Sequence, residues 1–217
     1  MLTYQTILFD LDGTLTDPKP GITKSIQYAL AHLHIPIHDL ETLTPFIGPP
    51  LSESFQRYYD LSPEQTQEAI RYYREYFADT GLYENAVYPE IPALLSALQR
   101  AGKRLAVATS KPTIFAERIL AHFQLNQYFD IVAGSEFDGT NSEKADVIAT
   151  VLRKLPGSTA QTTVMIGDRK HDIVGAQKND LHSIAVAYGY GTLEELQLAA
   201  PTYFAATVSE LVALFFH

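Results

Sequence analysis

The sequence contains no cysteine, so the chain can form neither disulfide bonds nor a metal site with thiolate ligands. Long hydrophobic runs are also missing. A membrane-spanning helix needs about 20 consecutive apolar residues, and the apolar runs at 7–11 and 211–216 are far shorter. A basic segment followed by a long apolar stretch does not occur near the first residues either. We therefore expect a cytoplasmic protein that does not bind membranes.

Basic residues are few in this chain. It has 16 Lys and Arg against 25 Asp and Glu, which gives a formal net charge of −9 at pH 7. Nucleic acids and anionic membranes attract basic surfaces, so neither is an expected partner. With 217 residues, of which 46% are hydrophobic, the chain has the size of one domain with a large insertion or of two small domains.

Residues 7–14 organise the remaining observations and read Ile-Leu-Phe-Asp-Leu-Asp-Gly-Thr. The apolar first half predicts a buried strand. Side chains alternate along a strand, so Asp10 and Asp12 should project to one side of its end, and Gly13 permits a tight turn. Adjacent carboxylates repel each other, which favours protonation of one of them or binding of a cation. The pattern indicates catalysis with a metal ion, and an ordinary polar turn is the alternative.

The hydrophobic pattern divides the chain into two kinds of segment. From about residue 21 to 79, apolar residues recur at helical spacing, and Ser62 with Pro63 marks the start of one helix. From about Val87 onward, amphipathic helices alternate with short apolar strand candidates at 105–108, 131–133, 163–166 and 183–187. This alternation is typical of a parallel sheet covered on both faces. The sequence thus predicts an α/β core with an all-helical insertion, and a functional site at the carboxyl ends of the strands.

A second strand end carries hydroxyl groups. The strand predicted at 105–108 is followed by Thr109-Ser110-Lys111-Pro112, and Pro112 is expected to start a helix. A hydroxyl and backbone N–H groups at a helix N-terminus can bind a phosphate oxygen. An ordinary helix cap at Thr109 or Ser110 is the alternative. Lys111 fits a contact with substrate and an exposed surface lysine equally well.

Two further segments supply a lysine and two more carboxylates. Residues 164–168 form an apolar strand that ends in Gly-Asp, and Asp172 follows four residues after Asp168. An acidic first helical turn would explain Asp172 alone, but Asp168 beside Asp10 would make an oxygen-rich pocket suited to Mg²⁺. Lys144 is predicted in the first turn of another helix, where a cation opposes the helix dipole. That local cost favours a functional role for Lys144.

Together these four motifs resemble the haloacid-dehalogenase-like phosphatase superfamily, in the expected order along the whole chain. The insertion between the first two motifs is similar to the small helical cap domain of phosphoglycolate phosphatases and related 5′-nucleotidases. The resemblance implies a Rossmann-like core domain of residues 1–15 and 87–217 and a cap domain of residues 16–86. The cap would close over the site, and Gly48 and Ser52 are candidates for contacting the substrate.

The resemblance also implies roles for individual residues. Asp10 would become a transient aspartyl phosphate, and Asp12 would protonate the leaving group and then activate a water. Thr109 and Lys144 would hold the phosphoryl group, although the family commonly has Lys-Pro where this sequence has Lys-Ala. The phosphate-binding residues implied in this way are Leu11, Asp12, Gly13, Thr109, Ser110 and Lys144.

Mg²⁺ is the cofactor that the resemblance implies. Its ligands would be the Asp10 carboxylate, the Asp12 backbone carbonyl and Asp168, and Asp172 would act through a bound water. The segment Gly189-Tyr-Gly191 contains half of a dinucleotide-binding fingerprint and lacks the third glycine, so it is predicted to be a turn.

The expected function is that of a Mg²⁺-dependent phosphatase acting on a small-metabolite phosphate monoester, of the phosphoglycolate or nucleoside 5′-monophosphate type. A phosphomutase of the β-phosphoglucomutase type is the nearest alternative, because it uses the same site and returns the phosphoryl group to a sugar. A catalytically silent binding or regulatory module is the alternative from another class. The sequence leaves open whether the chain is a monomer or a homodimer.

Overall fold

The computed structural model describes residues 1–137 and 140–217, which fold into two compact units. One unit contains Met1–Asp17 and Val87–His217, and the other contains Pro18–Ala86. Two short strands, β2 (Thr16–Asp17) and β3 (Ala86–Val87), pair where the chain passes between the units. No helix among the described residues is both long and apolar enough to span a membrane.

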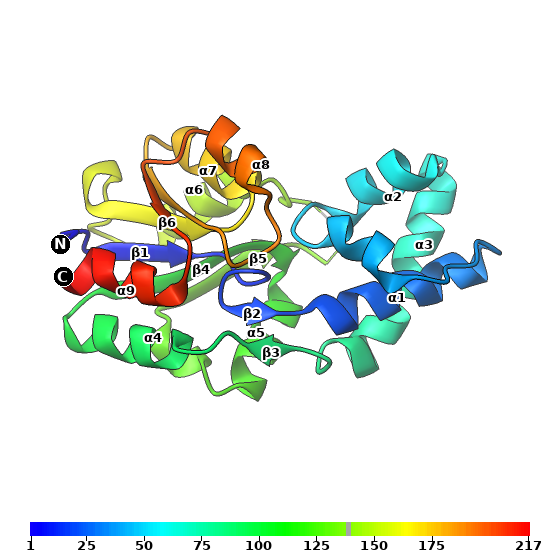
Figure 1. The fold of residues 1–217 in the computed structure, drawn as a ribbon, viewed down its shortest axis with the longest axis horizontal. Helices are drawn as coiled ribbons and strands as arrows, with labels where there is room; N and C mark the ends of the chain where they lie inside the picture. Colours follow the sequence, from blue (N-terminus) through cyan, green and yellow to red (C-terminus); the bar gives the residue numbers. More distant parts are fainter. Residues whose placement is uncertain (138–139) are drawn as a thin grey trace. The chain divides into compact units, whose positions relative to one another are not determined.

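The first unit is built on a six-stranded sheet that contains β1 (Thr6–Phe9), β4 (Arg104–Pro112), β5 (Ile131–Ser135), β6 (Thr163–Gly167), β7 (His182–Val186) and β8 (Tyr203–Ala205) (Figure 1). Neighbouring strands are parallel, and their order is β5-β4-β1-β6-β7-β8. Within this order Ile7 of β1 is level with Leu105 and with Val164. The predicted α/β fold with a parallel sheet is therefore confirmed.

Helices cover both faces of this sheet, which explains why its strands are continuously apolar. In Figure 1, α6 and α7 lie on one face, and α4 and α9 lie on the other. The helices of this unit are α4 (Ile91–Arg100), α5 (Thr113–His122), α6 (Lys144–Lys154), α7 (Lys170–Gln177), α8 (Leu193–Leu198) and α9 (Val208–Phe216). Two short 3₁₀ turns, η3 (Asn126–Tyr128) and η4 (Ala160–Thr162), precede β5 and β6.

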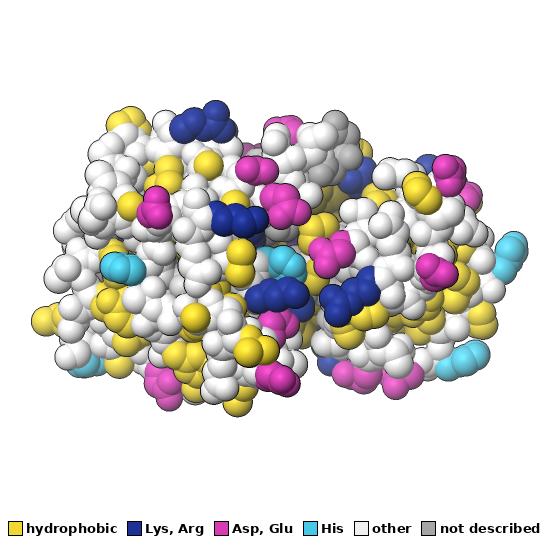
Figure 2. Space-filling view, turned by 90° about the horizontal axis from the view of Figure 1, so that it is seen from above, with side chains coloured by type: hydrophobic (Ala, Val, Ile, Leu, Met, Phe, Trp, Pro, Cys, Tyr) yellow, Lys and Arg dark blue, Asp and Glu magenta, His cyan; other side chains and the backbone are white. Residues whose placement is uncertain are grey.

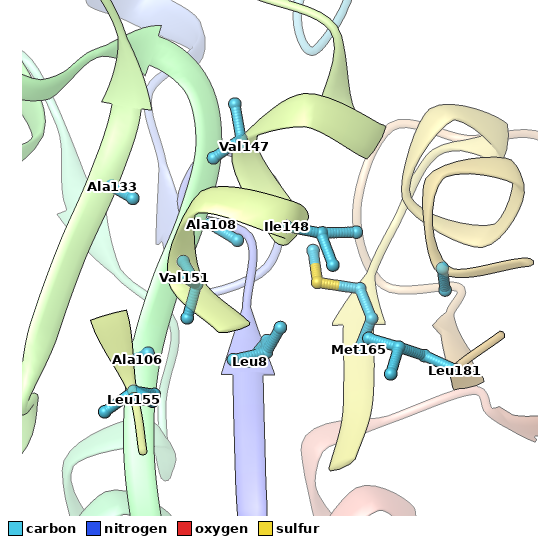
Figure 3. Packing of buried hydrophobic residues seen from close by; sticks show 11 residues of the cluster. Leu8, Ala106, Ala108, Ala133, Val147, Ile148, Val151, Leu155, Met165 and Leu181 are labelled. Carbon is cyan, nitrogen blue, oxygen red and sulfur yellow. The ribbon is translucent and has the colours of Figure 1, made fainter. Parts of the chain in front are cut away.

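Figure 3 shows helix α6 packed on the sheet through buried hydrophobic side chains. Its apolar stripe of Val147, Ile148 and Val151 packs onto apolar side chains of the strands, including Leu8 and Met165. All five side chains are essentially buried. Burying a side chain of this size stabilises the fold by about 1.5–3 kcal/mol. This packing fixes the first residue of α6, Lys144, at the end of the sheet where β1 stops.

The second unit is helical, with α1 (Lys19–His32), the 3₁₀ helix η1 (Leu40–Phe46), α2 (Leu51–Tyr59), α3 (Pro63–Tyr76) and the π-helical turn η2 (Phe77–Gly81). Ser62 caps α3 as predicted, because its hydroxyl accepts the Gln65 N–H at 3.2 Å and the Gln65 side chain accepts the Ser62 N–H at 3.0 Å. A Cβ on Gly21 would lie 1.9 Å from the Gly81 carbonyl oxygen, so these two glycines let α1 and η2 touch.

The prediction for the end of β4 is wrong. The strand does not stop at Ala108 but continues to Pro112, and α5 begins at Thr113 with no side-chain cap. Its register with β5 shifts between Ala108 and Pro112. A proline disfavours helical backbone at the residue before it, so Lys111 stays extended. Thr109 and Ser110 therefore lie in a strand and not at a helix N-terminus.

Charged side chains of both signs are interspersed on the face drawn in Figure 2. Among the described residues on that face, no broad area of basic side chains stands out. This distribution agrees with the low count of Lys and Arg.

Candidate active site

Three adjacent strands deliver polar side chains to one edge of the sheet. Asp10 and Asp12 follow β1, Asp168 follows β6, and Thr109 and Lys111 lie in the last part of β4. Because β1 lies between β4 and β6 and all three are parallel, their carboxyl ends meet at this edge. The sequence predicted this convergence from the order of its motifs.

Three buried carboxylates form a cluster that could hold a metal ion. Asp10, Asp168 and Asp172 each offer one oxygen, and these oxygens lie within 4.8 Å of one another. Burial raises the pKa of Asp168 well above its usual range, and the carboxylates of Asp172 and Asp10 raise it further. Like charges at ~4 Å repel by about 4 kcal/mol at an effective dielectric constant of ~20. A cluster of carboxylate oxygens with this cost fits a hard divalent cation.

Lys144 lies between two of these carboxylates. Its Nζ is 2.8 Å from Oδ1 of Asp10 and 2.8 Å from Oδ1 of Asp172, and it donates to the Ala108 carbonyl at 2.9 Å. Burial lowers the pKa of Lys144, but the carboxylates of Asp10 and Asp172 outweigh it, so the net pKa is raised and the ammonium keeps its charge. Lys144 is the first residue of α6, as predicted. Its ion pairs offset the unfavourable position at the positive end of the helix dipole.

Lys111 makes a second ion pair at the same edge. Its Nζ is 2.8 Å from Oδ2 and 3.0 Å from Oδ1 of Asp12, and the Lys111 side chain is only 6% exposed. Burial raises the pKa of Asp12, the Lys111 ammonium opposes this, and Asp10 raises the pKa again, with a raised value as the net result. Of the two interpretations that the sequence left open for Lys111, the exposed surface lysine is wrong.

Asp168 is held by hydrogen bonds to both of its oxygens. The Thr14 hydroxyl donates to Oδ1 at 3.1 Å, and the backbone N–H of Tyr190 donates to Oδ2 at 2.7 Å. Two glycines make room for it. A Cβ on Gly13 would lie 2.2 Å from Asp168 Oδ2, and a Cβ on Gly189 would lie 2.3 Å from the Gly13 carbonyl oxygen. Residues 189–191 form the predicted turn, and this turn packs directly on Asp168.

The chain is similar in sequence to a known protein family over most of its length. A sequence model of the haloacid dehalogenase-like hydrolases matches residues 7–186. The chain belongs to this family. It is an enzyme of the phosphoric monoester hydrolase class, as predicted from its motifs.

Three proteins of known sequence or structure are similar to this hydrolase over most of its length. A 5′-nucleotidase of Pseudomonas aeruginosa is 48% identical over 210 residues, which cover 97% of this chain and 95% of that protein. The tyrosine-protein kinase PtkA of Mycobacterium tuberculosis is 40% identical over 95% of this chain and 71% of its own length. The crystal structure of a predicted phosphatase from Clostridium acetobutylicum is 48% identical, covers 98% of both chains and has a TM-score of 0.95.

The remaining predicted residues of the hydrolase lie as follows. The Leu11 N–H donates to Asp10 Oδ1 at 2.7 Å, and Thr109 Oγ1 accepts the Lys111 N–H at 3.3 Å. Ser110 is partly buried in β4. Gly48 and Ser52 lie in the helical unit around the start of α2, where Gly48 has a φ of 105° and Ser52 is exposed. For these two residues the role toward a substrate stays a prediction.

Sequence reasoning missed the contacts that position the carboxylates of this hydrolase. Lys111 is 99 residues from Asp12, and Tyr190 is 22 residues from Asp168, so neither contact follows from a local pattern. Thr14 is the last residue of the first motif, but its hydrogen bond to Asp168 could not be predicted from that motif. The unusual composition of the Gly189-Tyr-Gly191 turn was the one signal available for the contact with Asp168.

Proposed function

We propose that this hydrolase is a Mg²⁺-dependent phosphatase that cleaves phosphate monoesters of small metabolites through an aspartyl phosphate on Asp10. The observation that carries the proposal is the pairing of Asp10 with the Lys144 ammonium at 2.8 Å, directly beside the carboxylates of Asp168 and Asp172. A carboxylate oriented by a buried cation and placed beside a metal-binding cluster suits a nucleophile that attacks phosphorus.

The charges of the site support a divalent cation. The site contains four carboxyl groups, those of Asp10, Asp12, Asp168 and Asp172, and two ammonium groups, those of Lys111 and Lys144. The formal surplus is two negative charges with all four carboxyl groups ionised and one with Asp12 protonated. Asp10, Asp168 and the Asp12 backbone carbonyl would hold Mg²⁺, and Asp172 would act through a water. When bound, Mg²⁺ supplies the positive charge that lets a phosphate dianion approach these carboxylates.

The first chemical step transfers the phosphoryl group to the enzyme. An Asp10 oxygen forms a bond to phosphorus while the bond from phosphorus to the ester oxygen breaks, and Asp12 gives its proton to that departing oxygen. Thr109 and Lys144 hold the phosphoryl oxygens during this transfer. The raised pKa of Asp12 favours the protonated form that this step requires.

The second step returns the enzyme to its starting state. Asp12, now a carboxylate, accepts a proton from a water whose oxygen attacks phosphorus. The bond between Asp10 and phosphorus breaks, and inorganic phosphate leaves. Asp12 thereby regains the proton that it gave to the alcohol, so the two steps balance without any further reactant.

We also propose that the helical unit Pro18–Ala86 acts as the cap and selects the substrate. The chain enters this unit at Pro18, shortly after the loop that contains Asp10 and Asp12. A nucleoside 5′-monophosphate is the first substrate to test, because the relative named 5′-nucleotidase is 48% identical over nearly the whole chain. Phosphoglycolate is the second. Gly48→Ala and Ser52→Ala should change the preference among such esters, and an unchanged preference in both variants would contradict this role.

The test is phosphate release from nucleoside 5′-monophosphates, phosphoglycolate and sugar phosphates, with Mg²⁺ and with EDTA. We expect release that depends on Mg²⁺ and is abolished by Asp10→Asn, which keeps the shape and removes the nucleophilic oxygen. An isomerised sugar phosphate in place of free phosphate would identify a mutase. Phosphate transfer from a nucleoside triphosphate to protein tyrosine, without ester hydrolysis, would replace the proposal with kinase activity. No turnover of any kind would favour the silent module.

A further inference from the structure

The two lysines of the site contact different carboxylates. Lys144 contacts Asp10 and Asp172, whereas Lys111 contacts Asp12 through both carboxylate oxygens, at 2.8 and 3.0 Å. Lys111 is therefore not a second copy of the lysine that faces the nucleophile. A cation that approaches both oxygens of one carboxylate limits the rotation of that carboxylate about its last bond.

The backbone of Lys111 is fixed as well as its ammonium group. Its N–H donates to the Thr109 hydroxyl at 3.3 Å. Its carbonyl oxygen lies so close to Gly134 that a Cβ there would come within 2.1 Å of it. The Gly134 N–H in turn donates to the Thr113 hydroxyl at 3.0 Å. Strand β5 thus supports the end of β4 from the side opposite to β1.

We propose that Lys111 is a positioning residue that holds the Asp12 carboxyl group where it must meet the oxygen of the leaving alcohol. This inference rests on the proposed function, in which Asp12 gives that oxygen its proton. Asp12 lies three residues beyond the last residue of β1, where its backbone forms an isolated bridge with Thr16. Its carboxyl group is therefore outside the regular strand, and the Lys111 ammonium contacts both of its oxygens. Both partners are largely buried, with side-chain exposures of 6% for Lys111 and 10% for Asp12, so water screens the ion pair weakly.

The leaving group offers a way to separate this role from others. An alkoxide is a poor leaving group and needs the proton of Asp12, whereas p-nitrophenolate leaves as a stable anion and needs little help. A residue that positions Asp12 should therefore matter for alkyl phosphates and hardly for p-nitrophenyl phosphate. A residue that binds the phosphoryl group, or that only supports the fold, should affect both esters alike.

The experiment compares kcat/KM of wild type, Lys111→Met, Lys111→Arg and Asp12→Asn for p-nitrophenyl phosphate and for the alkyl ester that the wild type hydrolyses best. This ratio covers the steps up to departure of the leaving group, so hydrolysis of the phosphoenzyme does not affect it. We expect Lys111→Met to lose on the order of 10²-fold with the alkyl ester and a few-fold at most with the aryl ester. Asp12→Asn should show the same selectivity. Adding Lys111→Met to Asp12→Asn should cause little further loss, because both changes remove one function.

Two controls keep the result interpretable. Lys178→Met removes an exposed lysine and should leave both esters unaffected. Lys111→Arg retains the charge and should recover part of the activity toward the alkyl ester. If Lys111→Met does not fold, kcat/KM of Lys111→Arg for the two esters is compared with wild type instead. Equal losses for both esters, or no loss, would overturn the role of Lys111 and leave the phosphatase standing. A wild type that cleaves neither ester would overturn the proposed function and this inference with it.

Discussion

At the scale of the residue, Lys144 both pairs with two buried carboxylates and holds the start of α6 against β4. Its ammonium neutralises Asp10 and Asp172, both buried, and its place at the start of α6 brings it within 2.9 Å of the Ala108 carbonyl. The side chain is 3% exposed, so removing it would leave two carboxylates buried without their cation. The free energy of unfolding should therefore depend on Lys144.

We predict that Lys144→Met lowers the free energy of unfolding by about 3–5 kcal/mol, the usual cost of removing one partner from a buried ion pair. Urea unfolding in the absence of Mg²⁺ measures this directly. Lys154→Met on the same helix is the matched control, because Lys154 lies exposed in the last turn of α6 and should matter little. Equal unfolding midpoints for the two variants would show that the contacts of Lys144 contribute nothing to the fold.

At the scale of the element, the turn between β7 and α8 supports the cluster more closely than its sequence indicated. Gly189 lies against both Gly13 and Asp168, and a Cβ there would be 2.4 Å from Asp168 Oδ2. The neighbouring Tyr190 N–H donates to that same oxygen at 2.7 Å. A displacement of this turn would thus move a carboxylate that we propose to bind the metal ion.

We predict that Gly189→Ala weakens Mg²⁺ binding by about 10–100-fold, the range usual for losing a group that orients a metal ligand. Titrating Mg²⁺ against thermal stability measures the change without relying on activity. Gly157→Ala is the control. Gly157 has a φ of +84°, so a side chain strains the backbone there, but nothing lies within 4 Å of the added Cβ. This control should lose some stability and keep its Mg²⁺ affinity, and the prediction fails if both variants behave alike.

Elements with strong local signals could be predicted from the sequence, and elements that depend on distant contacts could not. The sequence predicted the start of α3 at Ser62 and Pro63, because that start follows from local capping. The last part of β4 was predicted to be the start of a helix, because its extension depends on pairing with β5. Strand β8 was missed, since three residues at the sheet edge carry too little pattern.

The candidate site divides in the same way. Its carboxylates end apolar strands, and the lysine begins an amphipathic helix, so each could be located from the order of the motifs. The contact between Lys111 and Asp12 depends instead on the register shift in β4 and on the room that Gly134 leaves for the Lys111 carbonyl. No local pattern encodes either of these features.

At the scale of the whole molecule, the chain is acidic and buries some of its carboxylates, where ionisation is costly. The net charge is −9, and four of the carboxylates are buried at one edge of the sheet. The folded pKa of Asp168 is raised above its unfolded value, so its ionised form destabilises the fold. That penalty is absent when Asp168 is protonated and sets in fully once the pH exceeds the raised pKa. A cation bound at the cluster would remove it.

We therefore predict that Asp168→Asn changes both the stabilisation of the fold by Mg²⁺ and the pH dependence of stability without Mg²⁺. For wild type, Mg²⁺ at about 100 times its Kd should add about 2.7 kcal/mol of stability, which corresponds to roughly 5–10 °C in Tm for a chain of this size. Asp168→Asn should lose this shift. Without Mg²⁺ the variant should be at least as stable as wild type at neutral pH, and lowering the pH should stabilise it less than wild type, because the amide does not ionise. Asp146→Asn, an exposed position on α6, should keep the full Mg²⁺ shift. An Asp168→Asn variant that still gains stability from Mg²⁺ would show that the metal binds elsewhere. A variant that is much less stable than wild type without Mg²⁺ would show that the hydrogen bonds from Thr14 and Tyr190 outweigh the repulsion among the carboxylates.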